Sequence, residues 1–139
     1  MSEKSPITLT ADGQAPIDEA SYADLAEKIM ATAFTGNGHG KPFGGLTTSK
    51  IRDIYALIMN IYTKINEPGD FETYKNEMQY LRVKMAYEAG RDSAVKEFLE
   101  KTHLMETVRH IVTYEQFLLY CRYAESLVAY FKFYGGKDK

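Results

Sequence analysis

The C-terminal part of the chain contains the feature that most constrains its fold, a long segment that is apolar on nearly every side. It runs from Tyr114 to Tyr134 without proline or glycine, and the pair Gly135-Gly136 follows it. The absence of helix breakers predicts one long helix, and the glycine pair stands where a left-handed C-cap would end it. A helix that is apolar around most of its circumference must be covered on most sides. We therefore expect a central helix, a subunit interface, or both.

The segments that precede it also have helical spacing. Apolar residues three and four apart predict helices over Ser21 to Phe34, Thr47 to Asn66, Phe71 to Ala89 and Asp92 to Val112. Gly90 is expected to stop the third of these, and the fourth is expected with or without a break near Thr102. No segment shows sustained alternation of period two. The sequence thus predicts an all-α fold, a compact helical bundle of five to six helices with a long C-terminal helix.

The length of 139 residues predicts one domain. Residues 1–16 are polar and contain two prolines, so we expect a flexible N-terminus, followed by a single helical domain over 17–139. A glycine-rich loop is expected over 35–45. This loop does not fit a phosphate-binding loop, because Pro42 follows Gly40-Lys41 where serine or threonine is required and no strand precedes it.

Composition indicates an ordinary globular protein, with 45% hydrophobic and 26% charged residues. No apolar run is long enough to cross a bilayer, and the acidic N-terminus does not resemble a signal peptide, so no membrane contact is expected. The single cysteine, Cys121, lies within the apolar C-terminal segment and cannot form an intrachain disulfide. We interpret it as a core residue of a protein in a reducing cytoplasm.

No set of residues suited to catalysis is evident. The carboxylates are dispersed, and many stand three or four residues from a lysine, which is typical of a solvated helix surface. His103, Glu106 and His110 could share a helix face, but helical metal sites draw ligands from a second helix as well. We therefore expect no enzyme activity, no metal and no cofactor. A metal-dependent helical enzyme built on these three residues remains a rival hypothesis.

The basic residues are more informative because of their positions. Lys50 and Arg52 follow the hydroxyl cluster Thr47-Thr48-Ser49 in the first turn of the predicted second helix, where free backbone N–H groups and added cations suit an external anion. Lys75, Gln79 and Arg82 align along the predicted third helix. On spacing alone, ordinary solubilising charges are the favoured explanation of these residues. The net charge of −2 is uneven, since residues 1–40 contain six carboxylates and two lysines.

Three segments together carry a resemblance to a known family. They are LTTSKIRDIYALI (Leu46 to Ile58), YLRVKMAYEAGRD (Tyr80 to Asp92) and FLLYCRYAESLVAYFKFYGGKD (Phe117 to Asp138). In this order and at this spacing, the chain resembles the small subunit of the Csm complex, the type III-A CRISPR-Cas effector. None of the segments is a catalytic signature, and the resemblance covers the chain from Leu46 to its end.

The resemblance implies a small, helical, non-enzymatic RNA-binding protein that stacks in several copies along the duplex of guide and target RNA. Its implied partners are the guide (CRISPR) RNA, the target RNA, other copies of itself, and the backbone and large subunits of the effector. The implied RNA contacts are Lys50, Arg52, Arg82, Lys84, Arg91, Arg122 and Lys132. The acidic N-terminal third is expected to lie away from the duplex.

Physical chemistry limits how such a protein can hold RNA. Because the guide differs from one spacer to another, contacts should be electrostatic and independent of sequence. Stacking of unpaired bases on some of the eleven tyrosines is an alternative, but most of these tyrosines occupy core-compatible helical positions. A second alternative for the whole protein is a helical assembly factor whose basic residues contact partner subunits rather than RNA. The surplus of apolar area on the last helix also permits a dimer in isolation.

Overall fold

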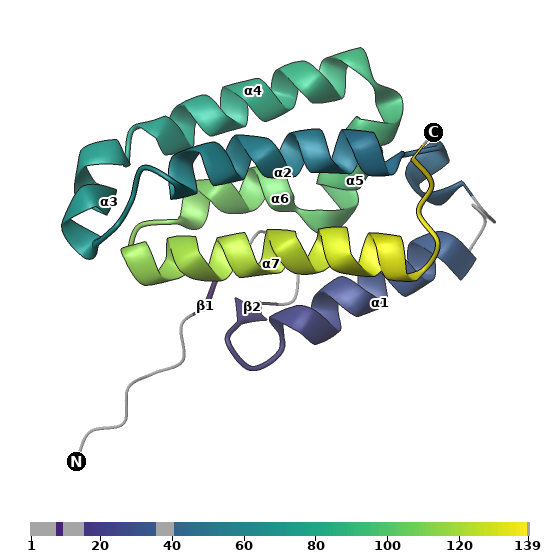
Figure 1. Ribbon diagram of the computed structural model, residues 1–139, viewed down its shortest axis with the longest axis horizontal. Coiled ribbons are helices and arrows are strands. Elements are labelled where there is room, and N and C mark those ends of the chain that lie inside the picture. The colour runs from purple at the N-terminus through teal and green to yellow at the C-terminus, as the bar shows by residue number, and fades with distance from the viewer. Residues whose placement is uncertain (1–7, 10–15, 36–40, 139) are drawn as a thin grey trace.

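The computed structural model describes residues 8–9, 16–35 and 41–138, and these residues are mainly helical. The seven α-helices that they form are α1 (Tyr22–Thr35), α2 (Thr48–Tyr62), α3 (Pro68–Tyr74), α4 (Glu77–Arg91), α5 (Ser93–Thr102), α6 (Leu104–Thr107) and α7 (Tyr114–Phe133) (Figure 1). Two short 3-10 turns, η1 (Pro42–Gly44) and η2 (Val108–His110), complete the helical structure. The predicted all-α class and the long C-terminal helix are confirmed.

Helix α7 is the centre of the fold. It packs against α1 on one side and α2 on the other (Figure 1). Its buried residues are Phe117, Leu119, Tyr120, Cys121, Tyr123, Ala124, Leu127 and Phe131. The ring of Phe131 meets that of Phe34 on α1 edge-on, at 5.4 Å between centroids. The expectation of a central helix is confirmed, and the chain itself covers most of the apolar circumference, with Phe133 left 72% exposed.

Both ends of α7 are capped by local side chains and glycines. At its start, Thr113 and Gln116 form a capping box, in which each side chain accepts from the other residue's backbone N–H. At its end, Gly135 adopts the left-handed conformation with φ 107°, and the Gly136 N–H donates to the Phe131 carbonyl at 2.9 Å. This is the Schellman arrangement, so the predicted C-cap is confirmed. The tail then continues to Lys137, whose carbonyl accepts the Thr48 N–H at 2.8 Å.

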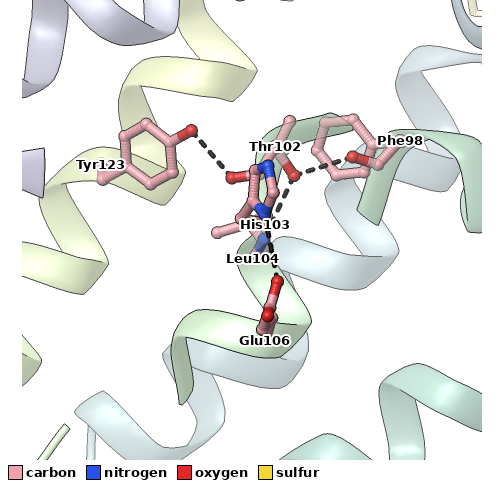
Figure 2. Close-up of polar contacts among 6 residues, drawn as sticks. All are labelled: Phe98, Thr102, His103, Leu104, Glu106 and Tyr123. Atoms are coloured by element: carbon pink, nitrogen blue, oxygen red, sulfur yellow. Dashed lines mark hydrogen bonds and ion pairs between the residues drawn. The ribbon is translucent and has the colours of Figure 1, made fainter. Parts of the chain in front are cut away.

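The junction between α5 and α6 is a sharp break that α7 stabilises (Figure 2). His103 adopts the left-handed conformation, with φ 61° and ψ 21°, which costs a residue with a Cβ about 1–2 kcal/mol. On either side of it, the Tyr123 hydroxyl donates to the Thr102 carbonyl at 2.9 Å and the Tyr120 hydroxyl donates to the Leu104 carbonyl at 2.7 Å. Each buried tyrosine thus finds its partner at the break near Thr102.

The structure divides two of the predicted helices, which raises the number of α-helices from five or six to seven in the described residues. The predicted third helix begins earlier, at Pro68, and is interrupted at Lys75 and Asn76, where the backbone bonds tighten to i+3 spacing. Gly90 does not stop α4, because the helix continues to Arg91. Asp92 ends it instead, since its extended backbone lets its carboxylate cap α5 by accepting from the Ala94 N–H at 2.9 Å.

A small strand pair near the N-terminus was not predicted. β1 (Thr8–Leu9) and β2 (Ile17–Asp18) run antiparallel, and the buried Leu9 and Ile17 pair with each other beside α7. Two residues per strand are too few for an alternating pattern to be visible in the sequence. Most of the predicted flexible N-terminus, residues 1–7 and 10–15, lies outside the described residues, as do residues 36–40 of the glycine-rich loop. The division into a flexible segment 1–16 and a domain 17–139 stays a prediction.

Gly136 generates a first testable prediction. A Cβ at this position would overlap the Phe131 ring and lie 2.9 Å from the Phe131 carbonyl oxygen. We expect Gly136→Ala to lower the free energy of unfolding by about 1–3 kcal/mol, measured by chemical denaturation. Gly90→Ala is the matched control, because its Cβ would meet nothing within 4 Å and the position is helical, so the change should stabilise by up to about 1 kcal/mol. Equal stability of the two variants would contradict the Schellman geometry.

The buried thiol of Cys121 generates a second prediction. Burial, with a smaller contribution from the charge of Glu125, raises its pKa from 9.0 to about 12. The thiolate is the reactive form, so the native protein should not react with a thiol-specific reagent at pH 8, whereas the unfolded protein should react fully. Because the unfolded state loses this proton first, stability should also fall as the pH rises above about 9. Rapid stoichiometric labelling of the native protein would show that Cys121 is not a core residue.

Candidate nucleic-acid interface

The seven predicted RNA contacts are distributed over three neighbouring helices. α2 packs against both α4 and α7, so the three form one layer with α2 in the middle (Figure 1). Lys50 and Arg52 lie on α2, Arg82, Lys84 and Arg91 on α4, and Arg122 and Lys132 on α7. The Lys50 ion pair and helical spacing assign six of the seven to the two seams of this layer, and the seventh, Arg82, lines a separate groove.

The first seam lies between α2 and α4. At one end, the Lys50 ammonium lies 3.9 Å from the Asp92 carboxylate, directly after α4. At the other end, the Lys64 ammonium lies 2.8 Å from the Glu77 carboxylate at the start of α4. Residues seven apart on a helix share one side, so Lys84 lies on the same flank of α4 as Glu77. This seam therefore carries Lys50, Lys84 and Arg91.

The second seam lies between α2 and α7. The phenol of Tyr55 on α2 faces α7, where partial burial and then the charge of Glu125 raise its pKa above the ordinary value. Arg52 precedes Tyr55 by three residues and Arg122 precedes Glu125 by three, while Lys132 follows Glu125 by seven, so the three cations line this side of their helices. The seam therefore carries Arg52, Arg122 and Lys132.

Arg82 lies apart from both seams. It lines a groove between α4 and the segment formed by α6 and η2, together with Arg109 and Met105. Lys75, Gln79 and Arg82 all line this groove, and the Arg82 guanidinium donates to the Gln79 side-chain oxygen at 3.1 Å. The prediction that all three lie along one helix is wrong, because Lys75 lies at the interruption between α3 and α4. Sequence reasoning missed Arg109, because helical spacing cannot be carried across the break at His103.

The cations differ in how free they are to bind an external anion. Lys50 pairs with Asp92, Arg91 with Glu88 at 3.6 Å and Lys132 with Asp138 at 3.6 Å. Such exposed pairs contribute little, so a phosphate can replace the carboxylate. Across residues 8–9, 16–35 and 41–138, no carboxylate lies within 4.0 Å of the remaining seam cations, which are Arg52, Lys84 and Arg122. These three are the most available cations of the two seams.

The predicted anion site at the start of α2 is wrong in one respect. Its backbone N–H groups are largely used within the chain, because the Thr47 hydroxyl accepts from the Lys50 N–H at 3.2 Å. The Thr48 N–H donates to the carbonyl of Lys137 in the C-terminal tail. The case for Lys50 and Arg52 as anion contacts therefore rests on their side chains and not on the end of the helix.

The residues of the rival metal site are separated by the fold. His103 pairs with Glu106 at 3.1 Å between Nδ1 and Oε2 (Figure 2), whereas His110 ends the turn η2. The part of the chain that the structure describes contains no group of three or more His, Cys, Asp or Glu side chains arranged to hold a metal ion. Nor do the same residues form a helix with the length and hydropathy needed to cross a membrane.

Comparison with known families gives a match that includes all three helices of this layer. The model of the Csm2 Type III-A family matches residues 26–137. The chain belongs to the Csm2 Type III-A family. The match begins inside α1, whereas the resemblance in the sequence begins at Leu46, so the family match also includes most of the first helix.

Curated proteins similar to this Csm2-family chain carry the name "CRISPR system Cms protein Csm2". One from Streptococcus thermophilus is 40% identical over 122 residues, which are 88% of this chain and 98% of the relative. One from Enterococcus italicus is 48% identical over 98 residues, covering 66% of this chain and 70% of the relative. One from Mycobacterium tuberculosis is 36% identical over 122 residues, covering 85% of this chain and 94% of the relative.

Proposed function

We propose that this protein is a non-catalytic RNA-binding subunit of a type III-A CRISPR (Csm) complex. Several copies lie along the duplex of guide and target RNA in the cytoplasm, beside the backbone and large subunits, and stabilise bound target RNA in antiviral defence. Membership of the Csm2 family supports the assembly. The observation that supports the RNA contact is the layer of α4, α2 and α7, whose two seams carry six of the seven cations.

The kind of contact follows from the chemistry of these seams. Arginine and lysine side chains on helices can neutralise phosphates without reading bases, which a complex with interchangeable guides requires. Arg52, Lys84 and Arg122 can do so without first leaving a carboxylate of the described chain. A modest number of cations per subunit is sufficient, because neighbouring copies and the other subunits raise the effective concentration of the RNA.

The position of the acidic residues agrees with this orientation. Asp24 and Glu27 belong to α1, which packs on the side of α7 opposite α2 (Figure 1). The central helix thus separates these carboxylates from the α2–α4 seam, which reduces their repulsion of a phosphate bound there.

Charge reversal tests the proposal. We expect the triple variant Arg52→Glu, Lys84→Glu and Arg122→Glu, in the reconstituted complex, to bind target RNA at least about tenfold more weakly. The slope of log affinity against log salt should fall by about 2 to 3, because each lost phosphate contact contributes about 0.7–0.9. Filter binding across a range of salt concentrations provides both quantities.

The matched control carries the same charge change on exposed lysines of other helices. It is Lys28→Glu, Lys96→Glu and Lys101→Glu, on α1 and α5. The proposal requires this control to keep both the affinity and the salt slope. If the seam variant assembles normally and retains target RNA as well as the control, the assigned contacts are wrong. If it fails to assemble while ultraviolet crosslinking of the unmodified complex finds no RNA adduct on α2, α4 or α7, the protein is an assembly factor instead.

A further inference from the structure

The outward side of α4 carries an unusual combination of aromatic and basic residues. Tyr80 is 58% exposed, Val83 59% and Tyr87 64%, although large apolar side chains are more often covered. Together with Lys84 and Arg91 they recur at helical spacing on one side of the helix, and we call these five residues the outer stripe of α4. The outer stripe contains no carboxylate.

Each tyrosine ring of the outer stripe has a cation above it. The Lys84 ammonium lies 4.6 Å from the centre of the Tyr80 ring, and the Arg91 guanidinium lies 5.4 Å from the centre of the Tyr87 ring. Each cation therefore lies within reach of a phosphate attached to a base that stacks on the ring beside it. An exposed aromatic ring next to a cation is the combination with which proteins bind unpaired nucleotides.

We propose that the outer stripe of α4 binds unpaired nucleotides of an RNA strand, with Tyr80 and Tyr87 as stacking surfaces for two bases. This inference rests on the proposed RNA-binding function and specifies which part of the RNA the surface binds. A base inside a duplex has both faces stacked already, so a tyrosine ring gains a base contact only where the nucleotide is unpaired. The seam cations outside the stripe, Lys50, Arg52, Arg122 and Lys132, need no such feature and can serve a paired backbone.

The geometry of α4 suits one strand. Tyr80 and Tyr87 are seven residues apart, which corresponds to about 10.5 Å along a helix. Successive bases of a stacked strand are separated by about 3.4 Å, so one strand can reach both rings within a few nucleotides. Val83, between the two rings, continues the apolar surface over which such a strand would pass.

Charge favours RNA over a protein as the occupant of this surface. An apolar protein partner that covered Tyr80 and Tyr87 would also take Lys84 and Arg91 out of water, and unpaired buried cations are costly. Among the residues that the structure describes, only Arg91 of these two has a carboxylate partner, the Glu88 side chain at 3.6 Å. A strand of RNA supplies the bases for the rings and the phosphates for the cations together.

Removal of the rings, with the charges kept, tests the proposal. The full chain with Tyr80→Ala and Tyr87→Ala should bind a single-stranded RNA oligonucleotide about tenfold more weakly or worse, measured by fluorescence anisotropy. For a base-free oligonucleotide of the same length, the affinity of this variant should equal that of the unmodified chain. Tyr80→Phe with Tyr87→Phe keeps both rings and should stay within about twofold of the unmodified chain. Tyr62→Ala removes a tyrosine that is 43% exposed on α2 and is the control for a general loss of aromatic surface.

A second measurement identifies the contact directly. Single-stranded RNA with 4-thiouridine should crosslink under ultraviolet light to Tyr80 or Tyr87, located by mass spectrometry. Unchanged single-strand affinity of the alanine variant, or an equal loss on the oligonucleotide without bases, would overturn the stacking proposal. So would a change in sedimentation with RNA affinity unchanged, since the stripe would then be a protein contact. Failure of the unmodified chain and complex to bind either paired or unpaired RNA would instead overturn the proposed function.

Discussion

The fold depends on how two buried hydroxyl groups of the central helix are satisfied. Tyr120 and Tyr123 are enclosed in the core, where an unpaired hydroxyl would cost about 1–3 kcal/mol. Their partners are the carbonyls of Leu104 and Thr102, which become available because the chain breaks at His103 instead of continuing α5 as one helix. The break and the tyrosines therefore stabilise each other. With this contact in place, α5 and α6 pack beside α4, and α4 is held against α2.

The same arrangement places the basic residues on helices that are packed against one another. α2 is held between α4 and α7 by its buried isoleucines, and its polar side remains open. Cations on α2 therefore lie beside cations of two other helices that are distant in the sequence. No single segment contains the surface, since Lys50, Lys84 and Arg122 come from three different elements. Its function depends on tertiary packing more than on any local motif.

Much of the fold could be predicted from local signals. The caps at Thr47, Asp92 and Thr113 act through hydrogen bonds between residues two or three apart. Such bonds can be predicted from the type of the capping residue and its position before an apolar helical pattern. The prediction that Gly90 ends its helix is wrong, because a glycine can also continue a helix and the cap at Asp92 decides where α4 ends. The strand pair of Leu9 and Ile17 could not be predicted, since it is stabilised by burial beside α7 and not by any pattern of its own.

For the site, the sequence and the resemblance supplied the residue types, and only the fold could group them. Arg82 and Lys84 are two residues apart and point to different sides of α4, so nearness in the sequence is misleading on a helix. The exposure of Tyr80 and Tyr87 could not be predicted from the sequence either, because most tyrosines of this chain occupy positions that suit a core. Exposure depends on which neighbouring helix covers a position, and sequence spacing does not contain that information.

The C-terminal tail has a consequence for affinity. Its Lys137 carbonyl accepts the Thr48 N–H at the start of α2 and so ties the end of α7 to the helix beside it. Arg52 and Lys132 therefore lie on elements that this hydrogen bond holds together before any ligand arrives. In the proposed complex, an RNA contact at these two residues would therefore order their side chains without first having to order the backbone that carries them. The last few residues of the chain, which contribute little to the core, thereby preorganise the surface on which we propose that the RNA lies.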